Sequence, residues 1–536
     1  MKLKLQKQLL ILSVSLILVN CSSVEKYNYK LSQTITVAKL QKDINYTQHK
    51  LEKLYPNLYG YITKEKLNFK FDSIRKVVTK PMTSKDFYFV ISPVVASVRQ
   101  GHMSMTQVSK RIPKKEAKRL KKAGDGPLSQ FVYEYQNDKL YVIKNKPKKV
   151  KIKLGTEVVS VNGIVPSAVF KKYRNSVTSD GFNQTLFRKY LVKRYVGYMT
   201  NEIGINDSLT FVLKLKDSVF TKVISRNKIV KKAVVKDDIK VKKDKDSITK
   251  IAKNPLEKAK LKLEKKNKNL YGYDYTTKEY VKSFKVVSSD TTVGIVRIKN
   301  FSDGRFKEAY ATIFDSIKLK NIQTLVIDIR GNPGGRVNDV VNLYSYLTDK
   351  EYTLLKPAEV TSKTSLWKLG MFAKLPKLAY PIGAVFYPIY MGFSYFRTTK
   401  NEDGSYQYKL VGSKPKPNNQ NYFKGKIYVI IDGGCFSAAC ILASSLKSNP
   451  NVVFIGEETG GNFNGTVAGI MPVVKLPNSK IALRLGLMNI QTINQTETIG
   501  RGIFPDKEIV PTVDDKISNK DPELEWILSE VKKQKP

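Results

Sequence analysis

One stretch decides the fold of this chain, Tyr428–Gly465, which reads YVIIDGGCFSAACILASSLKSNPNVVFIGEETGGNFNG. It begins with an apolar, mostly β-branched run over residues 428–431, which predicts a buried strand. The run breaks at a pair of glycines, and the small residues that follow predict a helix over 437–446. Ser437 is therefore expected at the corner between a strand and a helix.

A serine at such a corner has two interpretations. Its hydroxyl is presented above the edge of the sheet, and the unbonded N–H groups of the first helical turn can stabilise an anion beside it. That is the local geometry of a nucleophile for acyl transfer. The alternative is an ordinary helix N-cap, the commonest use of serine before a helix.

Composition limits what Ser437 can belong to. The chain has 536 residues, of which 41% are hydrophobic, so it has room for several domains with substantial cores. In a cytosolic protein a formal charge of +48 would first indicate nucleic-acid binding. The N-terminus argues against that compartment, because three lysines precede an apolar run over 9–19 that predicts a secretion signal rather than a spanning helix. We therefore expect no nucleic-acid partner.

The end of this signal is the sequence Leu-Val-Asn-Cys, which resembles a bacterial lipoprotein box. The resemblance implies that Cys21 carries the lipid and that the protein is a lipoprotein of the bacterial cell envelope. We expect it in the outer membrane, facing the periplasm or the surface. Asn20 departs from the box, where a smaller residue is usual, and the alternative is a plain cysteine that ends an ordinary signal peptide.

The other two cysteines, Cys435 and Cys440, lie on either side of Ser437. They are too few for a disulfide framework, and a bridge within one helical turn is geometrically awkward. We interpret both as small buried packing residues.

The chain divides into segments of different pattern. In order they are a signal peptide 1–20, a helical N-terminal region 21–125, a β-rich domain 126–216, a lysine-rich insertion 217–278, an α/β core 279–515 and a C-terminal helix 516–536. The centre of the β-rich domain, residues 154–163, resembles the strand and turn of PDZ domains. The insertion is interpreted either as a solvated linker or as an electrostatic contact with anionic lipid.

The sequence contains two histidines, His49 and His102. His49 lies among polar residues on a predicted helix, where we expect it to be solvated. His102 follows a glycine at the end of an apolar helix and precedes alternating methionines, a place from which a side chain can point into a cleft. A structural histidine is the alternative for His102.

The core contains the pattern of strand, glycine-rich turn and helix twice. The first copy is a continuous apolar strand over 324–329, the turn that ends in Gly334 and Gly335, and a helix over 337–347. The second is the stretch around Ser437. The sequence therefore predicts a multi-domain α/β protein in which two strand-to-helix turns meet at one sheet edge.

Four motifs occur in a fixed order: DIRGNPGG at 328–335, CFSAA at 435–439, GEETG at 456–460 and GIFPD at 502–506. Together they resemble the S41 peptidases, the tail-specific or carboxyl-terminal processing proteases. The resemblance implies a ClpP/crotonase-like core, protein or peptide substrates, and no metal or cofactor. It makes Ser437 the nucleophile and builds the oxyanion hole from the N–H of Ala438 with a backbone N–H around Gly334 and Gly335.

One departure bears on the mechanism. The Ser-Lys branch of the family has a general-base lysine where this chain has Asn462, and asparagine cannot accept the serine proton. The tricorn-like branch uses a histidine, and the Gly-His pair that ends in His102 resembles the pair found there. By this resemblance His102 is the base, Glu497 its orienting carboxylate and Ser104 an auxiliary hydroxyl; the alternative for Glu497 is a surface loop residue. A histidine base predicts activity that falls below about pH 6.5.

Two functions therefore remain open. The first is an exported, lipid-anchored serine endopeptidase, and the second is a catalytically inactive lipoprotein that keeps the fold as a scaffold or binding protein. A further stretch, residues 378–396, has nineteen residues without a charge. We expect it to form an apolar flap over the cleft or a patch that rests on the membrane, rather than a plain packed excursion.

Overall fold

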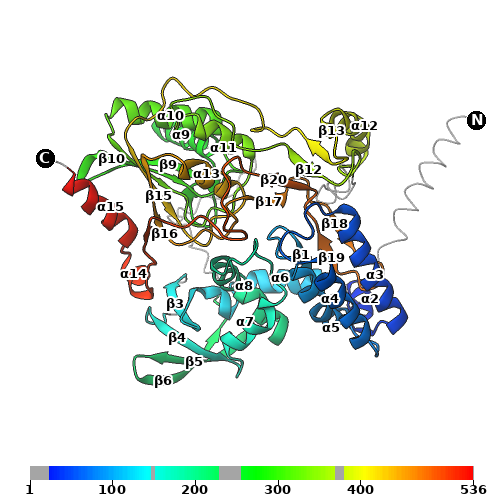
Figure 1. The fold of residues 1–536 in the computed structure, drawn as a ribbon. Coiled ribbons are helices and arrows are strands. Elements are labelled where there is room, and N and C mark those ends of the chain that lie inside the picture. Colours follow the sequence, from blue (N-terminus) through cyan, green and yellow to red (C-terminus); the bar gives the residue numbers. More distant parts are fainter. Residues whose placement is uncertain (1–22, 147–150, 228–254, 368–379, 535–536) are drawn as a thin grey trace, which may run out of the picture.

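The structure is a computed structural model that describes residues 23–146, 151–227, 255–367 and 380–534. The predicted signal peptide and Cys21 lie outside the described residues, as do residues 228–254 of the lysine-rich insertion. Figure 1 shows the N-terminal helices and the β-rich domain on one side of the molecule and the α/β core on the other.

The N-terminal region is helical, as the sequence predicts. Its elements are α2 Val24–Ser32, α3 Val37–Leu54, α4 Lys64–Val77, α5 Ser84–Ala96, the strand β1 Ser104–Thr106 and α6 Lys114–Ala123. Helix α5 contains Pro93 in its interior. His49 lies exposed on α3, which confirms the solvated interpretation.

The β-rich domain is one antiparallel sheet in the order β2-β3-β4-β5-β6, with two helices between its strands. Its elements are β2 Phe131–Gln136, β3 Lys139–Asn145, β4 Thr156–Val161, α7 Pro166–Arg174, α8 Thr185–Ile203, β5 Ser208–Leu215 and β6 Ser218–Ser225. Strand β6 pairs with β5 along its whole length, so the sheet continues past residue 216. Helices α7 and α8 were not expected from the sequence.

The core is built around a six-stranded sheet in the order β21-β16-β15-β11-β10-β9. All neighbours are parallel except β9 and β10. The strands are β9 Lys282–Val287, β10 Asp290–Ile298, β11 Thr324–Asp328, β15 Lys426–Ile431, β16 Val452–Gly456 and β21 Lys507–Glu508. The predicted parallel strands and the turns that follow them are thus present.

Helices cover both faces of this sheet. Helices α10 Phe306–Leu319, α11 Val337–Tyr344 and α13 Ala438–Lys447 share the large core cluster with one face. The other face packs against α15 Pro522–Lys533, through Ile527 and Val531. The predicted C-terminal helix is therefore two helices, because α14 Val513–Ser518 ends at Asn519, a residue in the left-handed conformation.

Two smaller sheets lie beside the main sheet, and one of them includes a strand of the N-terminal region. One has the order β13-β14-β12-β20-β17, and the other joins β1 to β19 and β18. Their strands are β12 Ala358–Val360, β13 Thr398–Lys400, β14 Tyr406–Tyr408, β17 Gly465–Ala468, β18 Val473–Lys475, β19 Ala482–Arg484 and β20 Met488–Gln491. The pairing of β1 with β19 attaches the segment just after His102 to the core.

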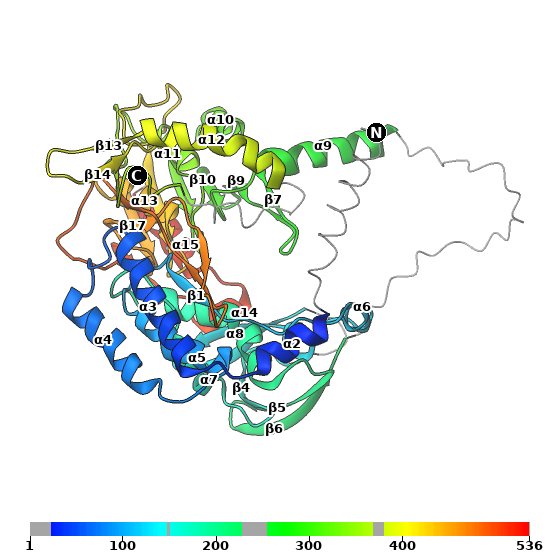
Figure 2. The same cartoon turned by 90° about the vertical axis from the view of Figure 1, so that its right-hand side faces the viewer.

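The lysine-rich insertion and the apolar stretch both contain a helix. Helix α9, Pro255–Tyr271, lies in the first, and α12, Tyr380–Phe396, in the second. Both views place these helices along the upper side of the molecule, away from the β-rich domain (Figures 1 and 2). No helix in the described part of the chain has the length and apolar character that crossing a membrane requires.

Candidate active site

The two predicted turns meet at the carboxyl ends of β11 and β15. The N–H of Phe436 donates a hydrogen bond of 2.9 Å to the carbonyl of Asn332. The carboxylate of Asp432 accepts bonds from the N–H groups of Gly331, at 2.6 Å, and Gly434, at 2.9 Å. These bonds fix each turn against the other, and they confirm the predicted meeting of the turns.

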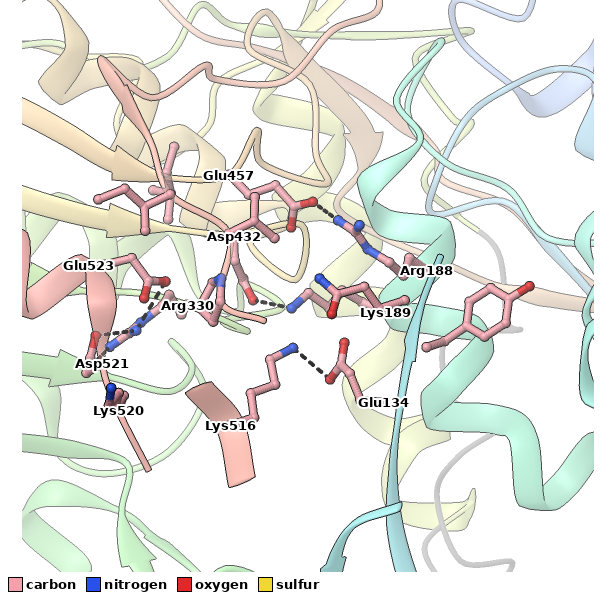
Figure 3. A pocket seen from close by; sticks show the side chains of 16 residues that line it. Glu134, Arg188, Lys189, Arg330, Asp432, Glu457, Lys516, Lys520, Asp521 and Glu523 are labelled. Atoms are coloured by element: carbon pink, nitrogen blue, oxygen red, sulfur yellow. Dashed lines mark hydrogen bonds and ion pairs between the residues drawn. The ribbon is translucent and has the colours of Figure 1, made fainter. Parts of the chain in front are cut away.

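Asp432 is also tied to the β-rich domain. Lys189 of α8 lies 3.1 Å from its carboxylate, and the neighbouring Arg188 pairs with Glu457 (Figure 3). These side chains line a charged cavity of about 220 Å³ between α8, the core and α14. Burial acts to raise the pKa of Asp432, but Lys189 and the two N–H donors outweigh it and hold that pKa below its usual value. The carboxylate is therefore charged at neutral pH.

Ser437 occupies a strained backbone position before α13. Its φ is 57° and its ψ is −122°, a conformation that a residue with a Cβ rarely adopts and that costs on the order of 1–3 kcal/mol. Although it stands at the N-cap position, its side chain makes no capping bond. The residue is half-buried. Its side chain is held at a tight turn without capping the helix, as the predicted role of nucleophile requires.

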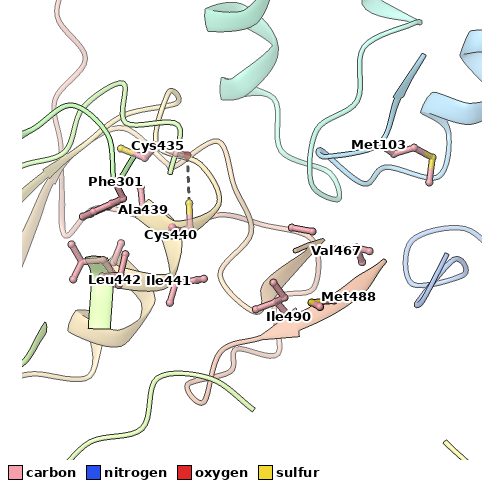
Figure 4. Close-up of a cluster of buried hydrophobic side chains, with 14 of the residues drawn as sticks. Met103, Phe301, Cys435, Ala439, Cys440, Ile441, Leu442, Val467, Met488 and Ile490 are labelled. Carbon is pink, nitrogen blue, oxygen red and sulfur yellow. Dashed lines mark hydrogen bonds between the residues drawn. The ribbon is translucent and has the colours of Figure 1, made fainter. Parts of the chain in front are cut away.

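The helix behind Ser437 is buried from Ala438 to Leu446, and Figure 4 shows the apolar side chains around it. Cys435 and Cys440 are free and buried, as expected for packing residues. The thiol of Cys440 donates to the carbonyl of Cys435 at 3.4 Å. Burial raises the pKa of Cys440 to about 12, so this thiol is neutral at physiological pH.

Gly334 packs directly against Ser437 and Ala438, an approach that only a glycine allows. A Cβ on Gly334, whose φ is 90°, would lie 2.7 Å from the amide nitrogen of Ala438. The N–H of Gly334 itself donates to Asn332 Oδ1 at 2.9 Å. Among the described residues, no hydrogen bond uses the N–H of Gly335 or of Ala438. These two groups are the free donors of the expected oxyanion hole. Gly334 lets the two turns approach each other.

His102 lies against the nucleophile turn. Its ring centroid is 4.8 Å from that of Phe436, the residue before Ser437. Its Nε2 is buried and has no hydrogen-bond partner in the described part of the structure. Burial, helped by the charge of Arg484, lowers the pKa of His102 to about 3. The ring is therefore neutral at physiological pH, the state that a general base requires.

The structure also describes the surroundings of Glu497, Ser104 and Asn462. Glu497 is exposed in the loop after β20, and no described contact joins it to His102. Ser104 lies in β1, opposite Arg484 of β19. Asn462 is buried and donates to the hydroxyl of Tyr61, so it has a structural partner and no role as a base.

The motifs at 456–460 and 502–506 hold one another. Arg501 donates to Glu458 at 3.0 and 2.8 Å, and the N–H of Gly502 donates to the same carboxylate at 2.8 Å. The hydroxyl of Thr459 accepts the N–H of Ile503 at 2.8 Å. The acidic motif therefore anchors the loop that follows Glu497.

Sequence reasoning missed one segment at the site, residues 178–183 between α7 and α8. These residues contact the turn around His102, the loop after Glu458 and the loop before Arg501. The local sequence reads TSDGFN, which signals a turn but not its partners. Every contact depends on residues far away in the chain.

With this geometry in place, comparison with known proteins gives a consistent result. Residues 292–509 match the model of Peptidase family S41. The carboxy-terminal processing protease CtpB of Bacillus subtilis (strain 168) is 26% identical over 193 residues, which are 36% of this chain and 29% of that protein. The chain thus matches less than a third of the length of that relative.

Two solved structures were matched over most of this chain at low sequence identity. Mature CPAF has a TM-score of 0.56 at 14% identity, covering 93% of this chain and 97% of that one. The tricorn protease has a TM-score of 0.38 at 12% identity, covering 92% of this chain and 36% of that one. The likeness to CPAF confirms the predicted α/β fold class.

The burial of His102 gives a testable titration. In His49→Gln, which leaves a single histidine, the imidazole of His102 should stay unprotonated from pH 8 to about pH 4, because its pKa is about 3. The imidazole nitrogen chemical shifts, which report the protonation state of the ring, measure this by NMR. Protonation of the ring with a midpoint near pH 6.5 would show that His102 is solvated rather than buried.

Proposed function

Because the core of this chain belongs to peptidase family S41, we propose that the protein is a serine endopeptidase that acts through an acyl-enzyme on Ser437, with His102 as general base. The observation that carries this proposal is the strained turn at Ser437. Its side chain makes no capping bond, the N–H groups of Gly335 and Ala438 are unused among the described residues, and the neutral ring of His102 contacts Phe436, the residue before Ser437. A structural serine does not need that strain.

The residues present supply each step of the reaction. Ser437 Oγ attacks the carbonyl carbon of a peptide bond while its proton passes to His102. The N–H groups of Gly335 and Ala438 donate to the oxyanion that forms, and such donors contribute several kcal/mol to the transition state. The C–N bond breaks as His102 returns the proton to the leaving amine. Water, deprotonated by His102, then cleaves the ester and restores Ser437.

Glu497 is proposed as the carboxylate that orients His102. In the structure Glu497 is exposed in the loop that ends at Gly500. The chain after this loop is held by the bond from Arg501 to Glu458. Hydrogen bonds between catalytic partners are often long before substrate binds. The proposal therefore requires the loop over 493–499 to bring Glu497 toward His102 when the cleft is occupied.

The substrates are proposed to be proteins or peptides. The matched relative is named a carboxy-terminal processing protease, which makes the C-terminal segments of proteins the first class to test. The competing function is an inactive scaffold or binding protein, and the observation that favours it is Asn462 in place of a lysine. The contact of the His102 ring with Phe436, next to Ser437, favours the peptidase, because a histidine base removes the need for that lysine.

Peptidase kinetics test the assignment of nucleophile and base. With fluorescein-labelled casein as substrate, Ser437→Ala and His102→Ala should each lower the rate by a similar large factor, up to ~10⁶, and the double variant should be hardly slower. Glu497→Gln should cost less, since an orienting carboxylate breaks no bonds. His49→Ala, an exposed histidine on α3, is the matched control.

Three outcomes contradict parts of the proposal. Full activity in His102→Ala removes histidine as the base, and full activity in Ser437→Ala removes the nucleophile. An inactive parent protein, tested also on peptides with free C-termini, would favour the scaffold function instead.

We also propose that the protein is exported and attached to the cell envelope through a lipid on Cys21. The lysines and the apolar run before Cys21 support export. A second contact with the membrane adds stability to such an attachment. Two described helices on the upper side of the molecule suit that contact (Figure 2).

Helix α12 presents an apolar face to solvent. Val385, Ile389, Phe393 and Phe396 share that face, with exposed fractions of 69, 67, 56 and 83%. On its other side, Ser394 is buried and accepts a bond from Trp367. Helix α9 carries six lysines and two glutamates. An apolar face and a cluster of lysines on one side of a protein match the surface of an anionic bilayer.

Detergent partitioning tests the lipid. In a Triton X-114 extraction of cells, the parent protein should enter the detergent phase, and Cys21→Ser should move to the aqueous phase because the lipid attaches through that thiol. Immunoblotting of the two phases measures the change. If Cys21→Ser stays with the detergent, the same extraction of Cys21→Ser combined with Val385→Ser, Ile389→Ser and Phe393→Ser shows whether α12 holds it there.

A further inference from the structure

The segment 178–183, which we call the clamp, belongs to the β-rich domain by sequence but to the candidate site by contacts. The N–H of Gly181 donates to the carbonyl of Arg99 at 2.8 Å, and the hydroxyl of Thr178 donates to the carbonyl of Met103 at 2.5 Å. These two bonds lie on either side of His102. The clamp therefore holds both ends of the turn that carries the histidine.

The same clamp reaches the two other loops of the site. The side chain of Asn183 donates to the carbonyl of Thr459 at 2.7 Å. The N–H of Phe182 donates to the carbonyl of Gly500 at 2.7 Å. One short connection thus joins the turn of His102, the loop that contains Asn462 and the loop that begins after Glu497.

Asp180 lies at the centre of the clamp and is almost fully buried, with 1% of its surface exposed. Its Oδ1 accepts the N–H of Gly101 at 2.7 Å and the hydroxyl of Thr466 at 3.4 Å. Its Oδ2 is buried without a hydrogen-bond partner among the described residues. A buried carboxylate with so few donors is costly, and such a group is retained in a protein for a reason.

The position of Gly101 shows what the carboxylate achieves. A Cβ on Gly101 would lie 2.5 Å from the ring of Phe436 and 3.0 Å from Asp180 Oδ1. The backbone before His102 is therefore pressed between the nucleophile turn and the carboxylate. Removing the acceptor would free this backbone on one side only, and the histidine would move relative to Ser437.

We propose that Asp180 is a positioning residue of the peptidase site, which holds Gly101 through its Oδ1 and so sets the distance from His102 to Ser437. This inference rests on the function proposed above. Asp180 acts through the backbone N–H of Gly101 and touches neither the substrate nor the reacting atoms. It differs in this from Glu497, which is assigned to the imidazole itself.

The charge of Asp180 gives the proposal a signature. Burial raises the pKa of Asp180 to about 6, although the N–H of Gly101, the hydroxyl of Thr466 and the N–H of Asn462 act against this rise. The titratable groups that face it are Tyr55, Tyr61 and Cys440, whose pKa values burial raises further, so all three are neutral at pH 6. Above about pH 6 the carboxylate is charged and holds Gly101 strongly. Below it the protonated acid is a weaker acceptor, and the turn loosens.

The parent enzyme should therefore lose activity as the pH falls through about 6, well above the pKa of about 3 of His102. In Asp180→Asn the amide oxygen still accepts the bond but has no charge to lose, so this inflection should disappear. Asp180→Ala, which lacks the acceptor, should lower kcat by about 10²-fold, the effect of a misplacement of about 1 Å, with little change in KM. Casein hydrolysis from pH 4.5 to 9 measures both effects.

Two controls make the experiment decisive. Asp138→Asn changes an exposed aspartate in the turn between β2 and β3 and should keep the parent profile. Hydrogen exchange of residues 99–103, measured in the Ser437→Ala background, should accelerate in Asp180→Ala even if no peptidase activity exists. If the proposed function fails, the parent protein does not hydrolyse casein. If this inference fails, the Asp180 variants behave as the parent does. Three results would overturn this inference. They are a kcat of Asp180→Ala equal to that of the parent, an unchanged inflection near pH 6 in Asp180→Asn, and unchanged hydrogen exchange in Asp180→Ala.

Discussion

The candidate site depends on one contact, the meeting of two strand-to-helix turns above the carboxyl edge of a parallel sheet. Parallel strands place their following turns at the same edge, so β11 and β15 bring these turns together without further information. Asp432 then ties them by accepting one N–H from each turn. Because Gly334 has no side chain, the turns approach closely enough for Ser437 to stand beside unused N–H groups.

This contact explains where strain is located and what offsets it. The backbone of Ser437 costs on the order of 1–3 kcal/mol, and a helix whose residues are buried from Ala438 to Leu446 follows directly. Fully burying one large apolar side chain contributes about 1.5–3 kcal/mol, so the packing of α13 outweighs the strain. The turn at Ser437 is formed by the core alone. The β-rich domain contacts it through Lys189, and the clamp around Asp180 joins that domain to Gly101 of the N-terminal region.

The sequence predicted those parts of the fold and site whose signals are local. Helix α13 lies within one residue of its predicted range 437–446, and the parallel strands β11 and β15 follow from continuous apolar runs. Helix α8 was missed although Leu191, Tyr195 and Met199 form a buried stripe, because other apolar and aromatic residues lie outside that stripe and weaken the helical period. Asp180 was missed for another reason. Its carboxylate matters only because Gly101 and Thr466, distant in the chain, fold against it.

The central claim is that the turn at Ser437 presents an activated nucleophile, and covalent labelling tests it most directly. The folded protein is treated with a fluorophosphonate at neutral pH, digested, and mapped by mass spectrometry. The account predicts one adduct, on Ser437, which disappears when the protein is unfolded before treatment and becomes far slower in His102→Ala. No adduct on Ser437 in the folded protein, or labelling at the parent rate in His102→Ala, would contradict it.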